Sequence, residues 1–262
     1  MKGARDREEL ERLRDAVSER LGFAFQADQL EQLGQTLQPR VRELGLEGLD
    51  AYVARLSSRE HGASETAALA ALVTVTETFF FRGQEQVHAL LEQVVPLRAT
   101  GARRLRVVCA GCASGEEPYS IAIALAEMLP DLDAWDVKLF GLDVTRAMLE
   151  KAARGRYGAW SLRAAPERLK ARYFEEQGRE FVLSPRIRRL VEFREVNLVE
   201  PNPLFFRSLA ADAVFCRNVL MYLTPEATRE VVRELTAALL PDGFLFLGHA
   251  ETLRGLSHDY HL

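Results

Sequence analysis

The sequence predicts an all-α segment followed by an α/β domain built on a parallel sheet. Over residues 1–75, apolar residues recur only at helical spacing, and no strand pattern is present. Over residues 101–262, short apolar runs alternate with helical patterns, which is typical of βαβ units. Residues 172–193 interrupt this alternation with the runs RYFEE, REFVL and RLVEF, so we expect a small antiparallel insert there. Residues 76–100 are interpreted as a linker region.

The individual elements follow from the apolar pattern and from glycine and proline. Gly22, Gly45, Gly48 and Gly62 separate the helices of the first segment. Pro118 suits the first turn of the helix that follows the first strand. The expected helices cover residues 10–21, 27–42, 49–56, 65–75, 118–129, 144–153 and 225–240, and the expected parallel strands cover residues 105–110, 137–142, 190–196, 213–216 and 244–248.

The composition is that of an ordinary globular protein. The chain has 262 residues, of which 48% are apolar and 27% are charged. No apolar run approaches the roughly 20 residues that span a bilayer, so we expect no membrane insertion. The net charge of −4 gives no electrostatic reason to expect nucleic acid as a partner. With three cysteines and a charged N-terminus, we expect a cytoplasmic protein without a disulfide framework.

A glycine-containing turn between the first strand and its helix predicts a cofactor site. Gly111 and Gly115 permit a tight turn and close approach of the backbone to a ligand. Asp143 ends the second strand, where a carboxylate can accept bonds from two ribose hydroxyls. Glu116 and Glu117 would repel a pyrophosphate but can pair with an amine. The pattern therefore favours S-adenosylmethionine, which carries adenosine and an amino-acid end, over a dinucleotide.

The cysteines of the same stretch do not favour redox or metal chemistry. Cys109 lies within an apolar strand, whereas a redox CxxC pair needs an exposed thiolate. A structural zinc site needs four ligands, and Cys216 is the only cysteine besides Cys109 and Cys112. We therefore predict no metal site and interpret all three cysteines as small buried apolar residues.

The chain resembles the CheR family of chemotaxis-receptor glutamate methyltransferases over nearly its whole length. GEEPYS and FCRNV followed by tyrosine are the most specific parts of this resemblance. The matching stretches are TVTETFFFR at 74–82, AGCASGEEPYSIAIAL at 110–125, FGLDVTRAMLEKA at 140–152, VEFREVNL at 191–198, FCRNVLMYL at 215–223 and PDGFLFLGHAE at 241–251, with RVRELGLEGLDAYVARL at 41–57 in the helical part.

The resemblance implies a helical N-terminal domain and a Rossmann-like class I methyltransferase sheet carrying a small antiparallel β-subdomain. It implies S-adenosylmethionine as cofactor and S-adenosylhomocysteine as product. Arg82 and Tyr222 would be catalytic and would orient the acceptor carboxylate. The cofactor-binding residues would be Thr76, Thr78, Arg82, Gly111, Glu116, Glu117, Asp143, Asn197, Leu198, Arg217 and Asn218.

Four of these residues also have plain structural interpretations. Asp143 can cap the helix after it. Asn197 can be a turn residue, Tyr222 a core aromatic, and Arg82 the partner of a surface carboxylate. The phenylalanine run at 79–81 is interpreted as core packing that pins Arg82 and the linker region against the sheet.

The mechanism follows from the acceptor that the resemblance implies. A glutamate side chain has a pKa of about 4.3, so it is already an anion at pH 7 and needs no general base. The enzyme has to align the carboxylate oxygen, the methyl carbon and the sulfur, and to exclude water. We therefore expect Tyr222 to position the acceptor by a hydrogen bond without activating it.

The chain departs from the family pattern at several places that concern cofactor and partner. Thr76 stands where many relatives have asparagine. The short loop at 175–180 predicts a member that works without a C-terminal tethering peptide on the receptor. The end at SHDYHL lacks one strand that relatives add, so we expect a truncated form or a further C-terminal domain.

The expected partners are the cytoplasmic helices of chemotaxis receptors. Relatives dock these acidic helices with a basic helix, but here the helix at 27–42 offers only Arg40 and Arg42. Residues 161–194 hold nine basic and five acidic residues, which is either a solvated surface or a docking face for an acidic partner. Two other functions stay open: a methyltransferase of this fold acting on another carboxylate or a small molecule, and a weakly active CheR-like module that binds cofactor and a signalling partner.

Overall fold

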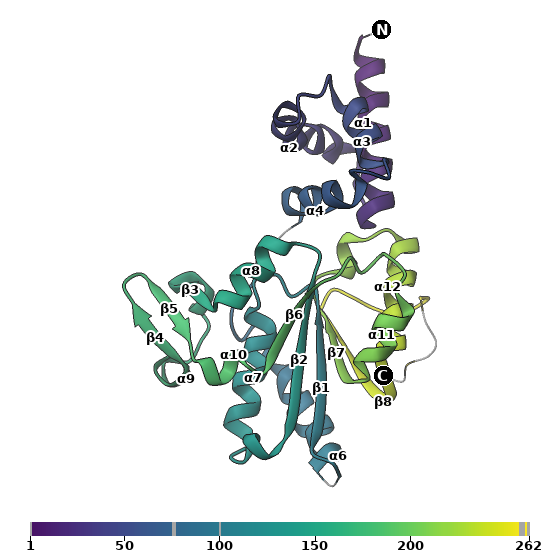
Figure 1. Ribbon diagram of the computed structural model, residues 1–262. Coiled ribbons are helices and arrows are strands. Elements are labelled where there is room, and N and C mark those ends of the chain that lie inside the picture. Colours follow the sequence, from purple (N-terminus) through teal and green to yellow (C-terminus); the bar gives the residue numbers. More distant parts are fainter. Residues whose placement is uncertain (1, 75–76, 100, 257–259, 261–262) are drawn as a thin grey trace. The chain divides into compact units, whose positions relative to one another are not determined.

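The chain forms two compact units in a computed structural model (Figure 1). The helical unit comprises Met1–Val75 with Tyr222–Val231, and the sheet unit comprises Thr76–Met221 with Val232–Leu262. The structure describes residues 2–74, 77–99, 101–256 and 260.

The helical unit contains the helices expected from the N-terminal pattern. Leu13, Val17, Leu37 and Tyr52 are fully or almost fully buried in its core, in keeping with the helical spacing of the apolar residues. Its elements are α1 (Lys2–Leu21), the 3₁₀ turn η1 (Ala27–Gln29), α2 (Leu30–Glu43), α3 (Leu49–Leu56), α4 (Gly62–Val73) and the first half of α12 (Pro225–Ala238).

A buried carboxylate joins three helices of this unit. The side chain of Glu65 on α4 is 1% exposed. It accepts bonds of 2.9 and 3.0 Å from Nε and Nη2 of Arg40 on α2, and Nε of Arg55 on α3 lies 3.6 Å away. Arg40 also donates to Glu43. One of the two basic residues that the second helix offers is therefore used inside the unit.

The sheet unit is built on a parallel sheet with strand order β6-β2-β1-β7-β8. Helix α7 contacts β1, β2 and β6, and α8 contacts β2 and β6. This confirms the predicted α/β fold class. The strands and main helices are β1 (Arg104–Ala110), α7 (Glu116–Met128), β2 (Asp136–Asp143), α8 (Arg146–Arg154), β6 (Val191–Glu195), α11 (Pro203–Leu209), β7 (Ala211–Cys216), α12 and β8 (Leu239–Leu247), with 3₁₀ turns η3 (Leu132–Ala134) and η5 (Leu220–Tyr222).

The antiparallel insert exists, but its boundaries differ from the expected 172–193. Its sheet has the order β3-β5-β4, and β3 lies well before the expected start. The run RLVEF is wrong as an insert strand, because its last three residues belong to β6, which confirms the parallel strand expected at 190–196. The elements are β3 (Arg156–Gly158), the 3₁₀ turn η4 (Ala159–Leu162), α9 (Glu167–Tyr173), β4 (Phe174–Gln177), β5 (Glu180–Leu183) and α10 (Pro185–Arg188).

The segment interpreted as a linker region contains a continuous helical stretch. It runs through α5 (Gln84–Ala89), the π-helical turn η2 (Leu90–Val94) and α6 (Val95–Ala99). Val87, Leu90, Val94 and Val95 are buried, and the stretch contacts α7, β1 and β7. The stretch is thus packed against the sheet as part of the sheet unit.

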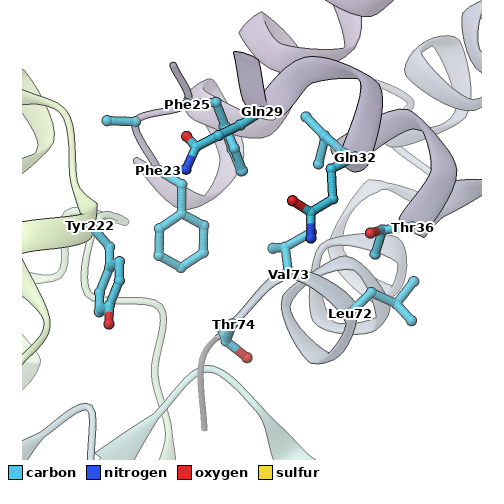
Figure 2. A pocket seen from close by; sticks show the side chains of 11 residues that line it. Phe23, Phe25, Gln29, Gln32, Thr36, Leu72, Val73, Thr74 and Tyr222 are labelled. Carbon is cyan, nitrogen blue, oxygen red and sulfur yellow. The ribbon is translucent and has the colours of Figure 1, made fainter. Parts of the chain in front are cut away.

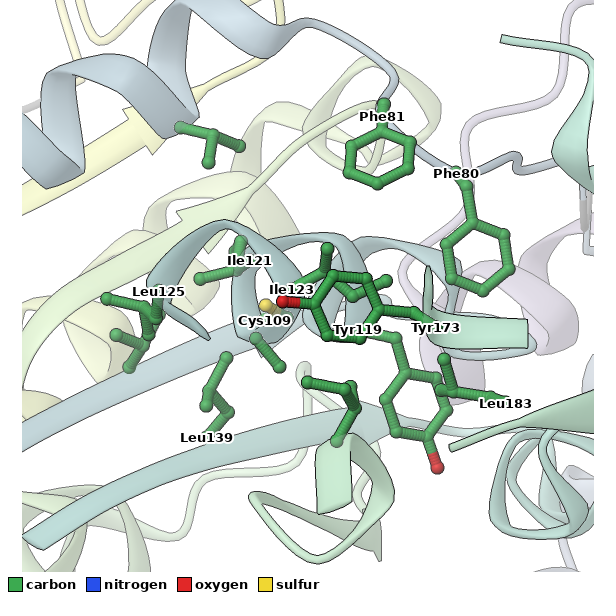
Figure 3. Close-up of a cluster of buried hydrophobic side chains, with 14 of the residues drawn as sticks. Phe80, Phe81, Cys109, Tyr119, Ile121, Ile123, Leu125, Leu139, Tyr173 and Leu183 are labelled. Atoms are coloured by element: carbon green, nitrogen blue, oxygen red, sulfur yellow. The ribbon is translucent and has the colours of Figure 1, made fainter. Parts of the chain in front are cut away.

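The core of the sheet unit extends from the parallel sheet to the insert (Figure 3). Phe80 is fully buried and meets the rings of Tyr157 and Phe174 edge to face, at centroid distances of 4.8 and 5.0 Å. Phe81 is also buried, while Phe79 is only half-buried. Two of the three phenylalanines therefore pin the segment that ends in Arg82. Among the described residues, no helix is both long and apolar enough to cross a bilayer.

Candidate functional site

The loop from β1 to α7 needs its two glycines for both conformation and space. Gly111 and Gly115 have φ values of 74° and 87°, in the left-handed region. A Cβ on Gly111 would lie 2.4 Å from Cγ2 of Val219. One on Gly115 would lie 2.8 Å from Cβ of Ala152 and 2.9 Å from Cζ of Phe193. The first glycine thus brings the β1–α7 loop against the segment that follows β7.

Asp143 ties the end of β2 to this loop. Its Oδ2 accepts the N–H of Ala113 at 2.8 Å, and its Oδ1 accepts the N–H of Thr145 at 2.8 Å. Burial raises the pKa of Asp143, and these backbone donors oppose the shift. Each oxygen keeps a second lone pair, so the carboxylate can still accept ribose hydroxyls. The capping and ribose interpretations are therefore compatible at this residue.

The two glutamates that open α7 face different partners. Glu116 is 1% exposed, and its carboxylate accepts the hydroxyls of Ser114 at 2.8 Å and Ser161 at 3.0 Å. The carbonyl of Ser161 accepts the N–H of Phe80 at 2.9 Å. Glu116 therefore braces η4 and the segment leading to Arg82, and its carboxylate is buried between two serine hydroxyls.

Glu117 pairs with Arg217 at the end of β7. Nη1 of Arg217 donates to Oε2 of Glu117 at 3.0 Å, and Nη2 donates to the carbonyl of Arg82 at 2.7 Å. Burial raises the pKa of Glu117, and the charge of Arg217 acts against this. A Cβ on Gly83 would lie 2.1 Å from Nη2, so this glycine makes room for the guanidinium. Arg217 thus links β7, α7 and the segment before α5.

The segment before α5 carries two further predicted residues. Nη1 of Arg82 donates to the carbonyl of Glu77 at 3.3 Å, and its guanidinium lies 5.8 Å from the ring centroid of Phe79. Thr78 is half-buried in the same segment. Thr76 lies outside the described residues.

The predicted adenine residues follow β6. Oδ1 of Asn197 accepts the N–H of Val199 at 3.4 Å, and its carbonyl accepts the N–H of Glu200 at 3.1 Å. Asn197 and Leu198 are both half-buried. The carboxyl ends of parallel strands share one edge of a sheet, so these residues lie at the same edge as Asp143 and Arg217.

Tyr222 lies in the helical unit, beside a cavity of about 390 Å³ (Figure 2). The carbonyl of Tyr222 accepts the N–H of Ala24 at 2.8 Å, and Leu223 forms a β-bridge with Phe23. Tyr222 is 36% exposed, so it is not a core aromatic. The lining side chains are uncharged: Phe23, Ala24, Phe25, Gln29, Gln32, Leu33, Thr36, Leu72, Val73, Thr74 and Tyr222.

Glu251 is a residue of this region to which the sequence assigned no role. Its carboxylate accepts backbone N–H groups from Asn218, Val219, Met221 and Gly248. Glu251 is the last residue of the stretch PDGFLFLGHAE, on which the family resemblance partly rests. This match is the only sign in the sequence that Glu251 has a role.

The sheet topology and this edge define a nucleoside-binding α/β enzyme of the class I methyltransferase type. The model "CheR methyltransferase, SAM binding domain" matches residues 76–262, and "CheR methyltransferase, all-alpha domain" matches residues 8–74. The chain belongs to the CheR methyltransferase family. It is an S-adenosylmethionine-dependent methyltransferase, and the residues at the sheet edge fit that cofactor through the free lone pairs of Asp143 and the glycine turn.

Curated relatives support the family over most of the chain. "Chemotaxis protein methyltransferase 1" of Pseudomonas aeruginosa is 35% identical over 85% of this chain and 82% of its own length. "Chemotaxis protein methyltransferase 2" of Vibrio cholerae is 32% identical over 96% and 88%. "Probable biofilm formation methyltransferase WspC" of Pseudomonas aeruginosa is 36% identical over 83% of this chain and 50% of its own length.

Proposed function

We propose that this enzyme forms methyl esters on glutamate side chains of chemotaxis receptors. The observation that carries the proposal is the state of the carboxylates beside the cofactor turn. Glu116 holds two serine hydroxyls, Glu117 holds Arg217, and Asp143 holds two backbone N–H groups. Among the described residues, no hydrogen bond or ion pair joins a histidine to any of them. Such a site suits an acceptor that needs no deprotonation, as a carboxylate does.

The residues at the sheet edge would hold the cofactor in the roles that the family resemblance assigns. Asp143 would accept the ribose hydroxyls, Asn197 and Leu198 would flank the adenine, and Glu117 would face the amino-acid end. S-adenosylmethionine, when bound, supplies a methyl group on a positively charged sulfur. The role of the protein is to hold the acceptor oxygen in line with that group and to keep water out.

Arg82 and Tyr222 would orient the acceptor carboxylate. Within the part of the chain that the structure describes, the guanidinium of Arg82 makes one hydrogen bond, of 3.3 Å, to the carbonyl of Glu77, which leaves it donors for a carboxylate. The half-exposed Tyr222 follows Arg217 by only a few residues along the chain, and its hydroxyl can donate one hydrogen bond. A bond of that kind fixes direction while leaving the other lone pairs of the carboxylate free to react.

The surface of the helical unit that would dock the receptor is expected to be less basic than in relatives. Arg40 is bound to Glu65 and Glu43, and the lining of the Tyr222 cavity is uncharged. The basic insert is also partly neutralised, because Glu127 pairs with Arg168 and Arg172. We therefore infer that receptor docking depends on shape and neutral contacts more than on a basic face, and that it takes place in the cytoplasm without a tethering peptide.

The test combines binding with methyl transfer. Calorimetry should show that S-adenosylhomocysteine binds, and labelled methyl groups should pass from the cofactor to receptor cytoplasmic fragments as base-labile esters. A base-stable product would indicate another acceptor group. Binding without transfer to any fragment would favour the weakly active signalling module. Because one relative is named for biofilm formation, fragments of receptors from both kinds of signalling system belong in the assay.

A further inference from the structure

One carboxylate, that of Glu251, holds the backbone of the loop that follows β7. Its Oε1 accepts the N–H of Val219 at 2.8 Å and of Met221 at 3.3 Å. Its Oε2 accepts the N–H of Asn218 at 3.0 Å and of Gly248 at 2.7 Å. An ionised carboxylate is an acceptor with about four lone-pair sites, so these four donors use it fully.

The local backbone is shaped to receive this carboxylate. Asn218 has a φ of 59°, in the left-handed region, which asparagine enters more readily than most non-glycine residues. A Cβ on Gly248 would lie 2.6 Å from Oε2 of Glu251 and 3.1 Å from the nitrogen of Asn218. Only glycine therefore lets the end of β8 close on the loop, and the carboxylate fills the space that remains.

This arrangement acts on the loop beyond Arg217 and leaves Arg217 itself to other partners. The guanidinium of Arg217 is held by Glu117 and by the carbonyl of Arg82. Glu251 instead fixes residues 218–221, and the peptide bond after Met221 leads directly to Tyr222. Arg217 and Tyr222 therefore have separate supports, and Asn218, which the family resemblance assigns to the cofactor, lies within the loop that Glu251 holds.

We propose that Glu251 is a positioning residue for methyl transfer: it holds the 218–221 loop so that Tyr222 meets the acceptor carboxylate. The proposal rests on the proposed function. A glutamine in its place would keep one accepting oxygen and would turn an NH₂ group toward backbone N–H groups, which releases about half of the loop.

The first experiment compares Glu251→Gln and Glu251→Asp with the wild type. We expect Glu251→Gln to lower kcat by about 10- to 100-fold, because a small misplacement of an orienting group has effects of that size. S-adenosylhomocysteine should bind with unchanged stoichiometry and within about threefold of the wild-type affinity. Glu251→Asp keeps the charge and should recover part of the loss. Glu150→Gln removes an exposed carboxylate that pairs with Arg146, and it should change nothing.

A double-mutant cycle with Tyr222→Phe separates positioning from general damage. If Glu251 acts through Tyr222, the variant carrying both changes should be no slower than the slower single variant. Losses that multiply would overturn the proposal, as would a wild-type kcat in Glu251→Gln. If Glu251→Gln does not fold, as judged by calorimetric stoichiometry, the cycle is run with Glu251→Asp and the same outcomes decide. A wild-type enzyme that methylates no receptor fragment would refute the proposed function instead.

Discussion

At the residue scale, the hydroxyl of Tyr222 is expected to matter for turnover and little for cofactor binding. Tyr222→Phe removes one hydrogen bond to a charged acceptor, worth about 1.5–3 kcal/mol, so kcat should fall about 10- to 100-fold. The affinity for S-adenosylhomocysteine should stay within about threefold. Steady-state kinetics with a receptor fragment and calorimetry measure the two effects. The matched control is Tyr173→Phe in the insert, which removes a hydroxyl that donates to Glu127.

Loss of cofactor binding with unchanged turnover of the bound complex would contradict this role for Tyr222. The same result would support Tyr222 as part of the cofactor site. No loss of either quantity would leave Arg82 as the remaining candidate for orienting the acceptor.

Gly111 is a residue of the cofactor turn at which substitution should be poorly tolerated. Gly111→Val combines a φ of 74° with a Cβ position only 2.4 Å from Cγ2 of Val219. We expect binding of S-adenosylhomocysteine to be lost in calorimetry. Cys109→Ala and Cys112→Ala, which change buried side chains of the same stretch, should leave binding largely intact. Normal binding by Gly111→Val would show that the loop can take another path.

At the element scale, the buried carboxylate of Glu65 is expected to hold α2, α3 and α4 together. Glu65→Ala leaves the guanidinium groups of Arg40 and Arg55 without their buried partner, which costs about 3 kcal/mol of unfolding free energy. Chemical denaturation followed by circular dichroism measures the loss. Glu11→Gln, at an exposed pair with Arg7, should be nearly neutral. Equal stability of the two variants would remove Glu65 as a structural tie.

The same carboxylate predicts how acid affects the helical unit. Burial by itself would raise the pKa of Glu65, but Arg40, Tyr52 and Arg55 together outweigh it and hold that pKa below its usual range. The stabilisation is therefore complete above the unfolded pKa of about 4.3 and is lost as pH falls through the lower folded value. Denaturation midpoints measured from pH 6 downward should drop more in the wild type than in Glu65→Ala.

Elements with a clear apolar period were predictable from the sequence, and the exceptions have physical reasons. β3 is only three residues long and contains Gly158, so its apolar pattern is too short to predict a strand. The helical stretch from Gln84 to Ala99 contains Pro96, which lacks an N–H and normally breaks a helix. The structure accommodates it by the π-helical turn η2, whose end is marked by the bond from Val95 N–H to the carbonyl of Leu90.

Only the residues that follow the ends of the parallel strands could be assigned to the candidate site from the sequence. The carboxyl ends of parallel strands share one edge, so Asp143, Asn197 and Arg217 could be grouped from their positions in the sequence. The long-range partners, Ala113 for Asp143 and Glu117 for Arg217, could not be predicted, because they come from segments far away along the chain. Glu251 illustrates this: it binds a loop about 30 residues earlier, and no periodicity marks such a contact.

At the scale of the whole molecule, the two units share one helix. Residues Pro225–Val231 of α12 belong to the helical unit, and the remainder of α12 belongs to the sheet unit, where Val232, Leu235 and Ala238 are buried. Unfolding of the sheet unit would remove the support of the second half of α12 and would fray its first half. We therefore expect the chain to unfold in one cooperative transition despite its two cores.

Ligand linkage tests this cooperativity. At a concentration of 100 times its Kd, S-adenosylhomocysteine should add about 2.7 kcal/mol to the unfolding free energy of the part of the chain that unfolds together with the cofactor site. If α12 couples the units, the ligand should raise the thermal midpoint of the entire helical signal in circular dichroism, and it should raise the midpoint of Glu65→Ala by a similar amount. Two transitions, of which only one responds to the ligand, would show that the helical unit melts on its own and that α12 can break at the boundary between Val231 and Val232.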